Sequence, residues 1–422
     1  MVKLSIVVPT RNRRDTLHHS LRTIFSQTCP LIEIIVSDNF SDDGTQDYVS
    51  SLNDSRLRYI NTGTRLSMSE NWEFALEHCN GEFVTFIGDD DGFTPDGVEI
   101  ALNHLDRSGL PAIIWEKAEY CWPDHVDSEL RNICVMRLSK FGQQTLNSST
   151  QLASVCSFKT CYSRLPCIYN GIVSTRVLRE IRDKSIDQKL FCGICPDVLS
   201  SIAVAASIPQ FAFLRYPISV NGASRHSNGT SCMRSNPTDK ESAHAKFLSE
   251  LNVSYPPEIQ MAPSVSTCCM GELLIARQSF TGIVFPEPKY VAYLRALVRE
   301  SLVSHRHDEL IQSAKHTASL VGIKLPPYRC PETFQPKPIV AGRNRDMLTQ
   351  RFPEDVVENI YDACQVVGSI ATSAANVNDK FVSQSQATVD LAAKLRRTYE
   401  KAKRHVFQAF PNSNRQQTRK AA

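Results

Sequence analysis

The chain has 422 residues, of which 42% are hydrophobic and 22% charged, ordinary proportions for a globular protein of two or three domains. Its formal net charge of +3 is too small to make nucleic acid an expected partner. The opening MVKLSIVVPT lacks the long apolar stretch and cleavage site of a secretory signal. No apolar run reaches the roughly 20 residues that a transmembrane helix needs. We therefore expect a cytoplasmic protein.

Fourteen cysteines are scattered through the chain, and in a reducing cytosol they are most simply small buried hydrophobic side chains. Cys192 and Cys195 form a CxxC pair. A zinc site would need a second such pair or two histidines at ligand spacing, and neither is obvious. The CxxC pair therefore predicts a structural role.

The first hundred residues alternate between strand and helix patterns. A helix is expected over residues 15–27. A second is expected to begin at the capping box of Ser67 and Glu70, and a third after Thr94 as its N-cap. Such alternation predicts a parallel, doubly wound sheet of the α/β class, which binds ligands beyond the carboxyl ends of its strands. Apolar runs rich in β-branched residues predict strands at 4–8, 33–37, 57–60 and 83–87.

The second half of the chain is less regular and more helical. The segment 227–241 is rich in Ser, Asn, Gly and Thr and indicates a boundary. We expect one domain over residues 1–230 and a mainly α-helical C-terminal region over 231–422. Helices are expected at 264–279, 289–304, 308–321, 354–366 and 382–408.

Aspartates follow two of the predicted strands. Asp38 follows the second strand, and the triplet Asp89, Asp90 and Asp91 follows the fourth, between two glycines. Adjacent carboxylates repel one another, and a divalent cation such as Mg²⁺ or Mn²⁺ removes that penalty while it shares its oxygen ligands with phosphate. The pattern therefore predicts a metal-bound diphosphate. An acidic run can also be a solvated surface, and Asp38 can be a turn residue.

Four ordered motifs resemble glycosyltransferase family 2. They are PTRNR at 9–13, EIIVSD at 33–38, SDDGT at 41–45, and GEFV at 81–84 ahead of the aspartates. The resemblance covers residues 1 to about 230. It implies the GT-A fold and an inverting transfer from a nucleoside-diphosphate sugar.

The resemblance also implies roles for single residues. Asp91 matches a metal-binding aspartate, and Gly88 stands where many members carry a further acid, so the register of the triplet is open by one position. The residues that it assigns to donor binding are Thr10, Arg11, Asp38, Asn71, Asp89 and Asp90.

An inverting transferase needs a carboxylate that takes the proton of the acceptor hydroxyl. The resemblance places this base at Asp197, ahead of an apolar helical run, where an aspartate can equally be a helix cap. The segment 221–227 resembles one that closes over the diphosphate. Its His226 is a candidate third metal ligand, or alternatively a solvated side chain.

The C-terminal tail is basic. Between residues 394 and 422, nine lysines and arginines face one acid, Glu400, with aromatic residues interleaved. Such a stretch can lie as an amphipathic helix on anionic lipid, or it can be a solvated end. We expect peripheral contact with the inner membrane face.

The resulting hypothesis is a glycosyltransferase of polysaccharide biosynthesis that needs Mn²⁺ or Mg²⁺. Its partners would be a nucleotide-sugar donor and a saccharide or lipid-linked acceptor. One alternative is a nucleotidyltransferase, which would want a glycine-rich loop after the first strand, where this chain has PTRNRRD. The other is a sugar-nucleotide-binding protein without catalytic activity.

Overall fold

A computed structural model describes residues 2–376 apart from short gaps. No helix in these ranges is both long and apolar enough to cross a membrane. The predicted helix at 382–408 and the basic tail lie outside the described residues. The gaps are 139–141, 235–238, 241, 303, 305, 326, 328–341, 345, 354 and 355.

A mostly parallel eight-stranded sheet forms the centre of the molecule, in the order β3-β2-β1-β4-β10-β6-β11-β9. Only β10 and β9 run against the other strands. The four strands predicted in the first hundred residues are confirmed, and so is the α/β class. The strands are β1 (Leu4–Thr10), β2 (Ile32–Asp38), β3 (Leu57–Asn61), β4 (Phe83–Phe86), β6 (Ala112–Trp115), β9 (Gln143–Asn147), β10 (Gly171–Ser174) and β11 (Gln210–Leu214).

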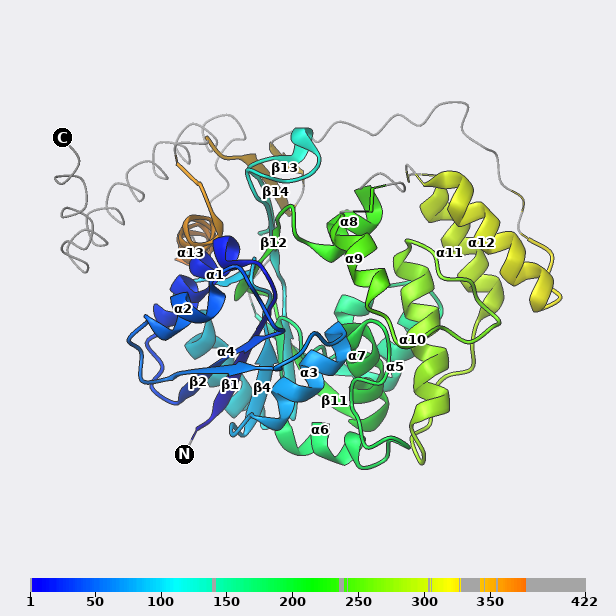
Figure 1. Cartoon of the computed structure of the whole chain (residues 1–422), viewed down its shortest axis with the longest axis horizontal. Coiled ribbons are helices and arrows are strands. Elements are labelled where there is room, and N and C mark those ends of the chain that lie inside the picture. The colour runs from blue at the N-terminus through cyan, green and yellow to red at the C-terminus, as the bar shows by residue number, and fades with distance from the viewer. Residues whose placement is uncertain are drawn as a thin grey trace.

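Helices cover both faces of this sheet (Figure 1). One face packs against α1 (Arg14–Phe25), α2 (Thr45–Ser50) and α4 (Gly97–Ser108). The strands are apolar on both sides because both sides are buried. The other face packs against α3 (Met68–Glu77), α5 (Ser148–Cys156), α6 (Thr175–Arg182) and α7 (Pro196–Ser207).

The predicted helix starts have different outcomes. The capping box of Ser67 and Glu70 is confirmed at the start of α3. The Thr94 cap is wrong, because α4 begins at Gly97 after Asp96 in a left-handed conformation. The Thr94 hydroxyl instead lies 2.8 Å from the carbonyl oxygen of Pro217, to which it donates a hydrogen bond.

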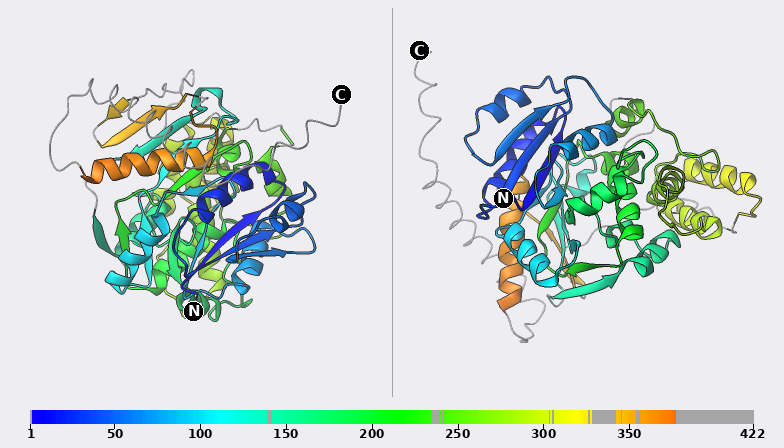
Figure 2. Two further views of the ribbon diagram at one scale, coloured as in Figure 1. Left: turned by 90° about the vertical axis from the view of Figure 1, so that its left-hand side faces the viewer. Right: turned by 90° about the horizontal axis from the view of Figure 1, so that it is seen from below.

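A second sheet combines distant parts of the chain in the order β13-β14-β8-β7-β12-β5. The last helix of the described residues, α13 (Ile360–Asn376), packs on this sheet and beside α1 (Figure 2). The predicted helix at 354–366 is therefore misplaced toward the N-terminus. The strands are β5 (Gly92–Phe93), β7 (Ala118–Cys121), β8 (Ile133–Arg137), β12 (Ser219–Ala223), β13 (Gly342–Asn344) and β14 (Met347–Arg351).

The stretch of chain between β12 and β13 is helical in the described residues. Helices α10, α11 and α12 enclose a small apolar core around Tyr293, Leu294 and Leu310, and α10 also packs on α7. The domain boundary near residue 230 stays a prediction. β14, which follows that boundary in the chain, pairs with β8, which precedes it, so the second sheet contains strands from both sides of the boundary. The helices are α8 (Asn228–Arg234), α9 (Ala243–Ser249), α10 (Val265–Ser279), α11 (Tyr290–Ser301) and α12 (His307–Leu320).

Candidate active site

Strand register brings several predicted site residues to one edge of the large sheet. Thr10 at the end of β1 pairs with Asp38 at the end of β2, and Val7 pairs with Phe86 at the end of β4. The loop after β4 therefore starts beside Thr10. The Thr10 hydroxyl donates a 2.8 Å hydrogen bond to Asp89.

The counter-ion of Asp89 is Arg13. The guanidinium lies 3.1 Å from one carboxylate oxygen and donates a 2.6 Å hydrogen bond to the carbonyl of His226. Burial raises the pKa of Asp89, and the positive charge of Arg13 opposes that rise. The PTRNR motif at 9–13 contains both Arg11 and Arg13. The sequence of this motif gives no reason to expect Arg13 rather than Arg11 as the partner of Asp89.

Asp91 is enclosed by protein donors. Its Oδ1 accepts from the Gly222 amide at 2.7 Å, and its Oδ2 accepts from the Tyr169 hydroxyl at 2.6 Å and the Asn170 amide at 3.1 Å. Burial and the adjacent charge of Asp90 raise the pKa of Asp91 to about 6. A metal ion at Asp91 would have to displace these donors. The assignment of Asp91 as metal ligand stays a prediction.

Asp90 is held on one side only. Its Oδ2 accepts hydrogen bonds from the hydroxyls of Ser224 at 2.7 Å and Ser227 at 2.5 Å, in the loop after β12. Among the described residues, the hydrogen bonds to this carboxylate all reach Oδ2, which leaves Oδ1 for another ligand. A Cβ at Gly88 would lie 3.2 Å from that Oδ1 and 2.6 Å from the Tyr169 hydroxyl.

A divalent cation fits this arrangement at Asp90. Mg²⁺ and Mn²⁺ are often bound by one or two carboxylates together with substrate phosphates, so a single open oxygen is sufficient from the protein. The missing side chain at Gly88 keeps the space before Asp90 Oδ1 clear. The open oxygen of Asp90 therefore favours Asp90 over Asp91 as the metal ligand.

The ring of His226 faces α1. Its Nε2 lies 3.3 Å from Asp15 and 3.1 Å from the Arg225 side chain, while its backbone carbonyl binds Arg13. The ring forms no hydrogen bond with the triplet in the described part of the chain. Its role as a metal ligand stays a prediction.

Asp38 organises the loop after β2. It is fully buried and accepts hydrogen bonds from the Ser41 hydroxyl at 2.5 Å and the Tyr59 hydroxyl at 2.6 Å. Burial and this bond raise the pKa of Tyr59 to about 12. Asn71 likewise accepts from the Ser37 hydroxyl at 2.7 Å. The donor-binding roles of Asp38 and Asn71 stay predictions.

Arg11 is paired with a residue beyond the predicted domain boundary. Its guanidinium lies 2.5 Å from Glu250, which follows α9, and Arg65 pairs with the same carboxylate. Asn252 donates a 2.8 Å hydrogen bond to Glu70. The segment after α9 therefore packs near the carboxyl ends of the strands, against Arg11 and Glu70. Contact of Arg11 with a nucleotide stays a prediction.

Asp197 lies in the first turn of α7 and accepts a 2.9 Å hydrogen bond from the Tyr162 hydroxyl. Burial raises the pKa of Asp197, while the Tyr162 bond opposes the rise. Burial and the charges of Asp91 and Asp197 raise the pKa of Tyr169. The negative charge of Asp197 therefore acts on Tyr169, the tyrosine that donates to Asp91.

Two buried glutamates hold the loop that precedes Asp197. Glu73 of α3 accepts from the backbone amides of Leu190 and Phe191 at 2.8 and 2.9 Å. Glu272 of α10 accepts from the amides of residues 194 and 195 at 3.0 and 2.8 Å. These carboxylates fix the start of α7. They escaped prediction because nothing in their local sequence marks them.

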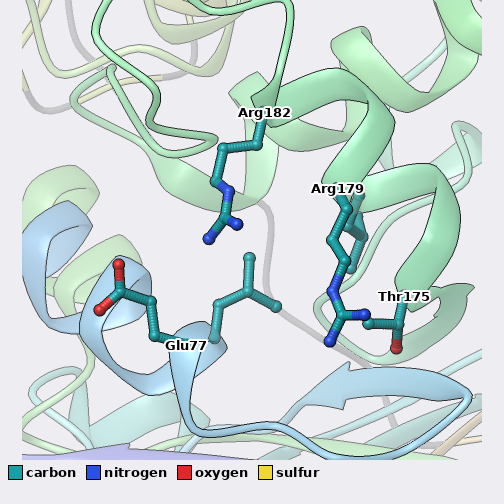
Figure 3. Close-up of a pocket in the computed structure, with 6 residues that line it drawn as sticks. Glu77, Thr175, Arg179 and Arg182 are labelled. Carbon is teal, nitrogen blue, oxygen red and sulfur yellow. The ribbon is translucent and has the colours of Figure 1, made fainter.

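A pocket of about 260 Å³ lies at the opposite edge of the sheet (Figure 3). Thr175 follows β10, whose last residue pairs with Phe83 at the start of β4. This pocket therefore lies away from the triplet and is not part of the candidate site. Its lining residues are Leu76, Glu77, Thr175, Leu178, Arg179 and Arg182.

The closing of the loop after β12 over the triplet depends on Gly222. A Cβ there would lie 1.8 Å from the carbonyl oxygen of Asp90 and 2.6 Å from the Trp122 indole nitrogen. We expect Gly222→Ala to lower the free energy of unfolding by about 1–3 kcal/mol and to weaken nucleotide-sugar binding. Denaturant unfolding and calorimetry measure the two effects. Gly229→Ala is the control, because a Cβ at Gly229 meets no atom within 4 Å. Equal stability of both variants would contradict the close contact.

Comparison with known proteins finds similar sequences and structures. Residues 5–161 match the family model Glycosyl transferase family 2. The chain is 40% identical over 94 residues to the GalNAc(5)-diNAcBac-PP-undecaprenol beta-1,3-glucosyltransferase of Campylobacter jejuni, which covers 22% of this chain and 30% of that protein. It is 31% identical over 106 residues to the Escherichia coli UDP-Glc:alpha-D-GlcNAc-diphosphoundecaprenol beta-1,3-glucosyltransferase WfaP, which covers 25% of this chain and 42% of that protein.

The match thus spans less than half the length of these relatives. Among solved structures, Staphylococcus aureus TarS 1-349 in complex with UDP-GlcNAc aligns with a TM-score of 0.45 and 16% identity, over 76% of this chain and 93% of that one. The family match, the four ordered motifs and the aspartate triplet coincide in one part of the molecule. Residues 5–161 of the chain are thus similar to glycosyltransferase family 2, as the four motifs indicated.

Proposed function

We propose that the chain transfers a sugar from a nucleoside-diphosphate sugar to a hydroxyl of a saccharide or lipid-linked acceptor, with the help of a divalent cation. The observation that carries this proposal is the aspartate triplet, which is buried at the carboxyl edge of the sheet with one carboxylate oxygen left open. The names of the two curated relatives, both of which act on undecaprenol-linked saccharides, support a lipid-linked acceptor.

Asp90 would hold the cation, Mn²⁺ or Mg²⁺, through Oδ1. When bound, such an ion stabilises negative charge on the departing diphosphate. Asp89 is paired with Arg13 and oriented by Thr10, so it would be placed to accept hydrogen bonds from the sugar donor. Asp91 positions the loop by binding Tyr169 and Gly222.

Asp197 would act as the base. As the acceptor oxygen attacks the anomeric carbon, its hydroxyl proton passes to the Asp197 carboxylate and the bond to the diphosphate breaks. One displacement of this kind inverts the anomeric configuration. Burial raises the pKa of Asp197 and so increases its tendency to take a proton.

The metal assignment is tested by comparing Asp90→Asn with Asp91→Asn. We expect Asp90→Asn to raise the Mn²⁺ concentration for half-maximal release of nucleoside diphosphate by about tenfold or more, because it weakens a direct ligand. Asp91→Asn should mainly lower the melting temperature, because its carboxylate binds protein donors. A panel of nucleotide sugars with graded Mn²⁺ measures the first effect. A metal shift in Asp91→Asn alone would instead make Asp91 the ligand.

The base assignment is tested by Asp197→Asn. We expect kcat to fall by about 10²–10⁴-fold while the affinity for the donor changes little, since a base acts in the transition state. Steady-state kinetics and donor-binding calorimetry separate the two. Asp187→Asn, at an exposed position earlier in the same stretch of chain, should retain wild-type kinetics. Loss of donor binding with unchanged turnover per bound donor would make Asp197 structural.

We also propose that the basic stretch from Lys394 to Lys420, which lies outside the described residues, docks the protein on anionic lipid. Binding to phosphatidylserine-containing vesicles should exceed binding to neutral vesicles and should fall as salt rises, because electrostatic attraction is screened. Deletion of residues 394–422 should abolish co-sedimentation and spare donor hydrolysis. Equal binding by the deleted and full-length chains would make the tail a solvated end.

A further inference from the structure

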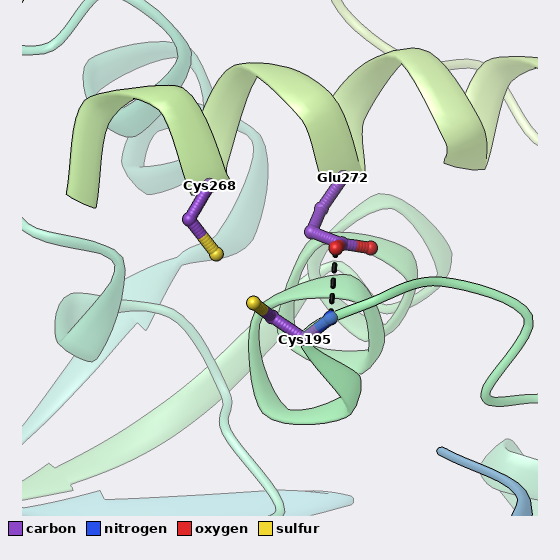
Figure 4. Close-up of side chains that lie close together, drawn as sticks. All are labelled: Cys195, Cys268 and Glu272. Atoms are coloured by element: carbon purple, nitrogen blue, oxygen red, sulfur yellow. Dashed lines mark hydrogen bonds between the residues drawn. The ribbon is translucent and has the colours of Figure 1, made fainter. Parts of the chain in front are cut away.

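Three potential ligand atoms of different residues converge at the start of α7. Cys195 directly precedes α7, and Cys268 and Glu272 stand four residues apart on one face of α10. Figure 4 shows both sulfur atoms and a Glu272 oxygen facing one another. The three ligand atoms lie within 4.8 Å of each other, and no other group of this kind is found in the described ranges.

We propose that Cys195, Cys268 and Glu272 bind a zinc ion that fastens α10 to the start of α7. Thiolates favour Zn²⁺ over the Mg²⁺ or Mn²⁺ proposed at the triplet, because they are softer ligands than oxygen. With zinc–sulfur bonds of about 2.3 Å, sulfur atoms in a tetrahedral site are about 3.8 Å apart. The observed separations therefore need to shrink by about 1 Å at most.

The surroundings suit a cation. Glu272 is buried, Cys195 and Cys268 are partly buried, and the negative charge of Asp197 acts on Glu272. In the described part of the chain, neither Lys nor Arg forms an ion pair with Glu272. The Glu272 oxygen on the side of the sulfur atoms, Oε1, accepts the amide hydrogen bonds of residues 194 and 195, and Oε2 is buried without a hydrogen-bond partner. The Tyr255 hydroxyl lies 3.4 Å from Glu272 Oε1 and 4.0 Å from Cys195 Sγ, so a further oxygen lies beside the cluster.

Without metal, burial favours the protonated forms of this cluster. It raises the pKa of Glu272 to about 8, and the hydrogen bond with Cys195 together with burial raises the pKa of Cys268. Zinc would replace the two thiol protons and the Glu272 carboxyl proton, and these three protons pass to solvent as two Zn–S bonds and one Zn–O bond form. Oxidation state does not change in this step, and no further reactant is required.

The zinc site would act on catalysis only through position. Cys195 lies two residues before Asp197, and Glu272 already binds the amides of residues 194 and 195. Gly193 permits this approach, because a Cβ there would lie 1.9 Å from Glu272 Oε2. Zinc would hold the loop more firmly than these hydrogen bonds alone. Its binding does not depend on the identity of the donor or on the cation at Asp90.

The test is metal analysis of the full-length chain purified with a phosphine reductant and without added zinc. We expect about one zinc ion per chain by mass spectrometry, retained in excess Mg²⁺. Cobalt substitution should produce a thiolate-to-cobalt absorption band. Cys195→Ser and Cys268→Ser should lose both signals, whereas Cys161→Ser, at an exposed position, should keep them.

Glu272→Gln guards against variants that fail to fold, because its amide oxygen can still accept the backbone hydrogen bonds. We expect this variant to weaken zinc binding by about tenfold or more and to keep the wild-type circular dichroism spectrum. Wild-type protein without zinc or a cobalt band would overturn the proposal, and so would a Cys195–Cys268 disulfide in the purified chain. Transferase activity is not the readout, so failure here leaves the proposed function standing.

Discussion

Three adjacent carboxylates buried after the end of β4 constrain the carboxyl edge of the large sheet. A buried charge is tolerated only when it is paired or hydrogen-bonded, and each aspartate of the triplet meets that demand differently. Asp89 takes Arg13 as its counter-ion, Asp90 takes two serine hydroxyls, and Asp91 takes Tyr169 and a backbone amide. The start of α1, the loop after β12 and the loop before β10 must therefore converge on one point. The open oxygen of Asp90 is what remains after these demands are met.

Buried, hydrogen-bonded carboxylates also determine the structure around Asp197. Glu73 and Glu272 are buried acids that accept backbone amide hydrogen bonds from the loop before α7. Glu73 belongs to α3 and Glu272 to α10. These two side chains therefore fix the course of a loop that has no helix or strand hydrogen bonds of its own. A base and a donor site must keep a constant separation for transfer to be efficient. In the proposed mechanism, buried carboxylates would fix this separation at both ends.

The chain beyond residue 230 contributes to this site in ways that its sequence does not announce. Glu250 pairs with Arg11, and Glu272 braces the loop before Asp197. α13 lies beside α1, where the Arg22 guanidinium is 4.1 Å from the centre of the Tyr361 ring. Local patterns correctly indicated that the helices are present, yet they placed α13 too early. They also carried no information on which earlier element each helix would contact.

The sequence by itself determined the strand ends and the residues that gather there. Continuous apolar runs mark strands buried on both faces, and parallel strands finish at one edge, so Thr10, Asp38 and Asp89 could be expected together. Only the tertiary structure decided the partners: Arg13 rather than Arg11 for Asp89, Asp91 closed by four donors, and Cys195 beside Cys268 and Glu272. Hydrogen bonds and metal ligation act over about 3 Å and join residues far apart in the chain. Their pairing follows from packing, which no local pattern encodes.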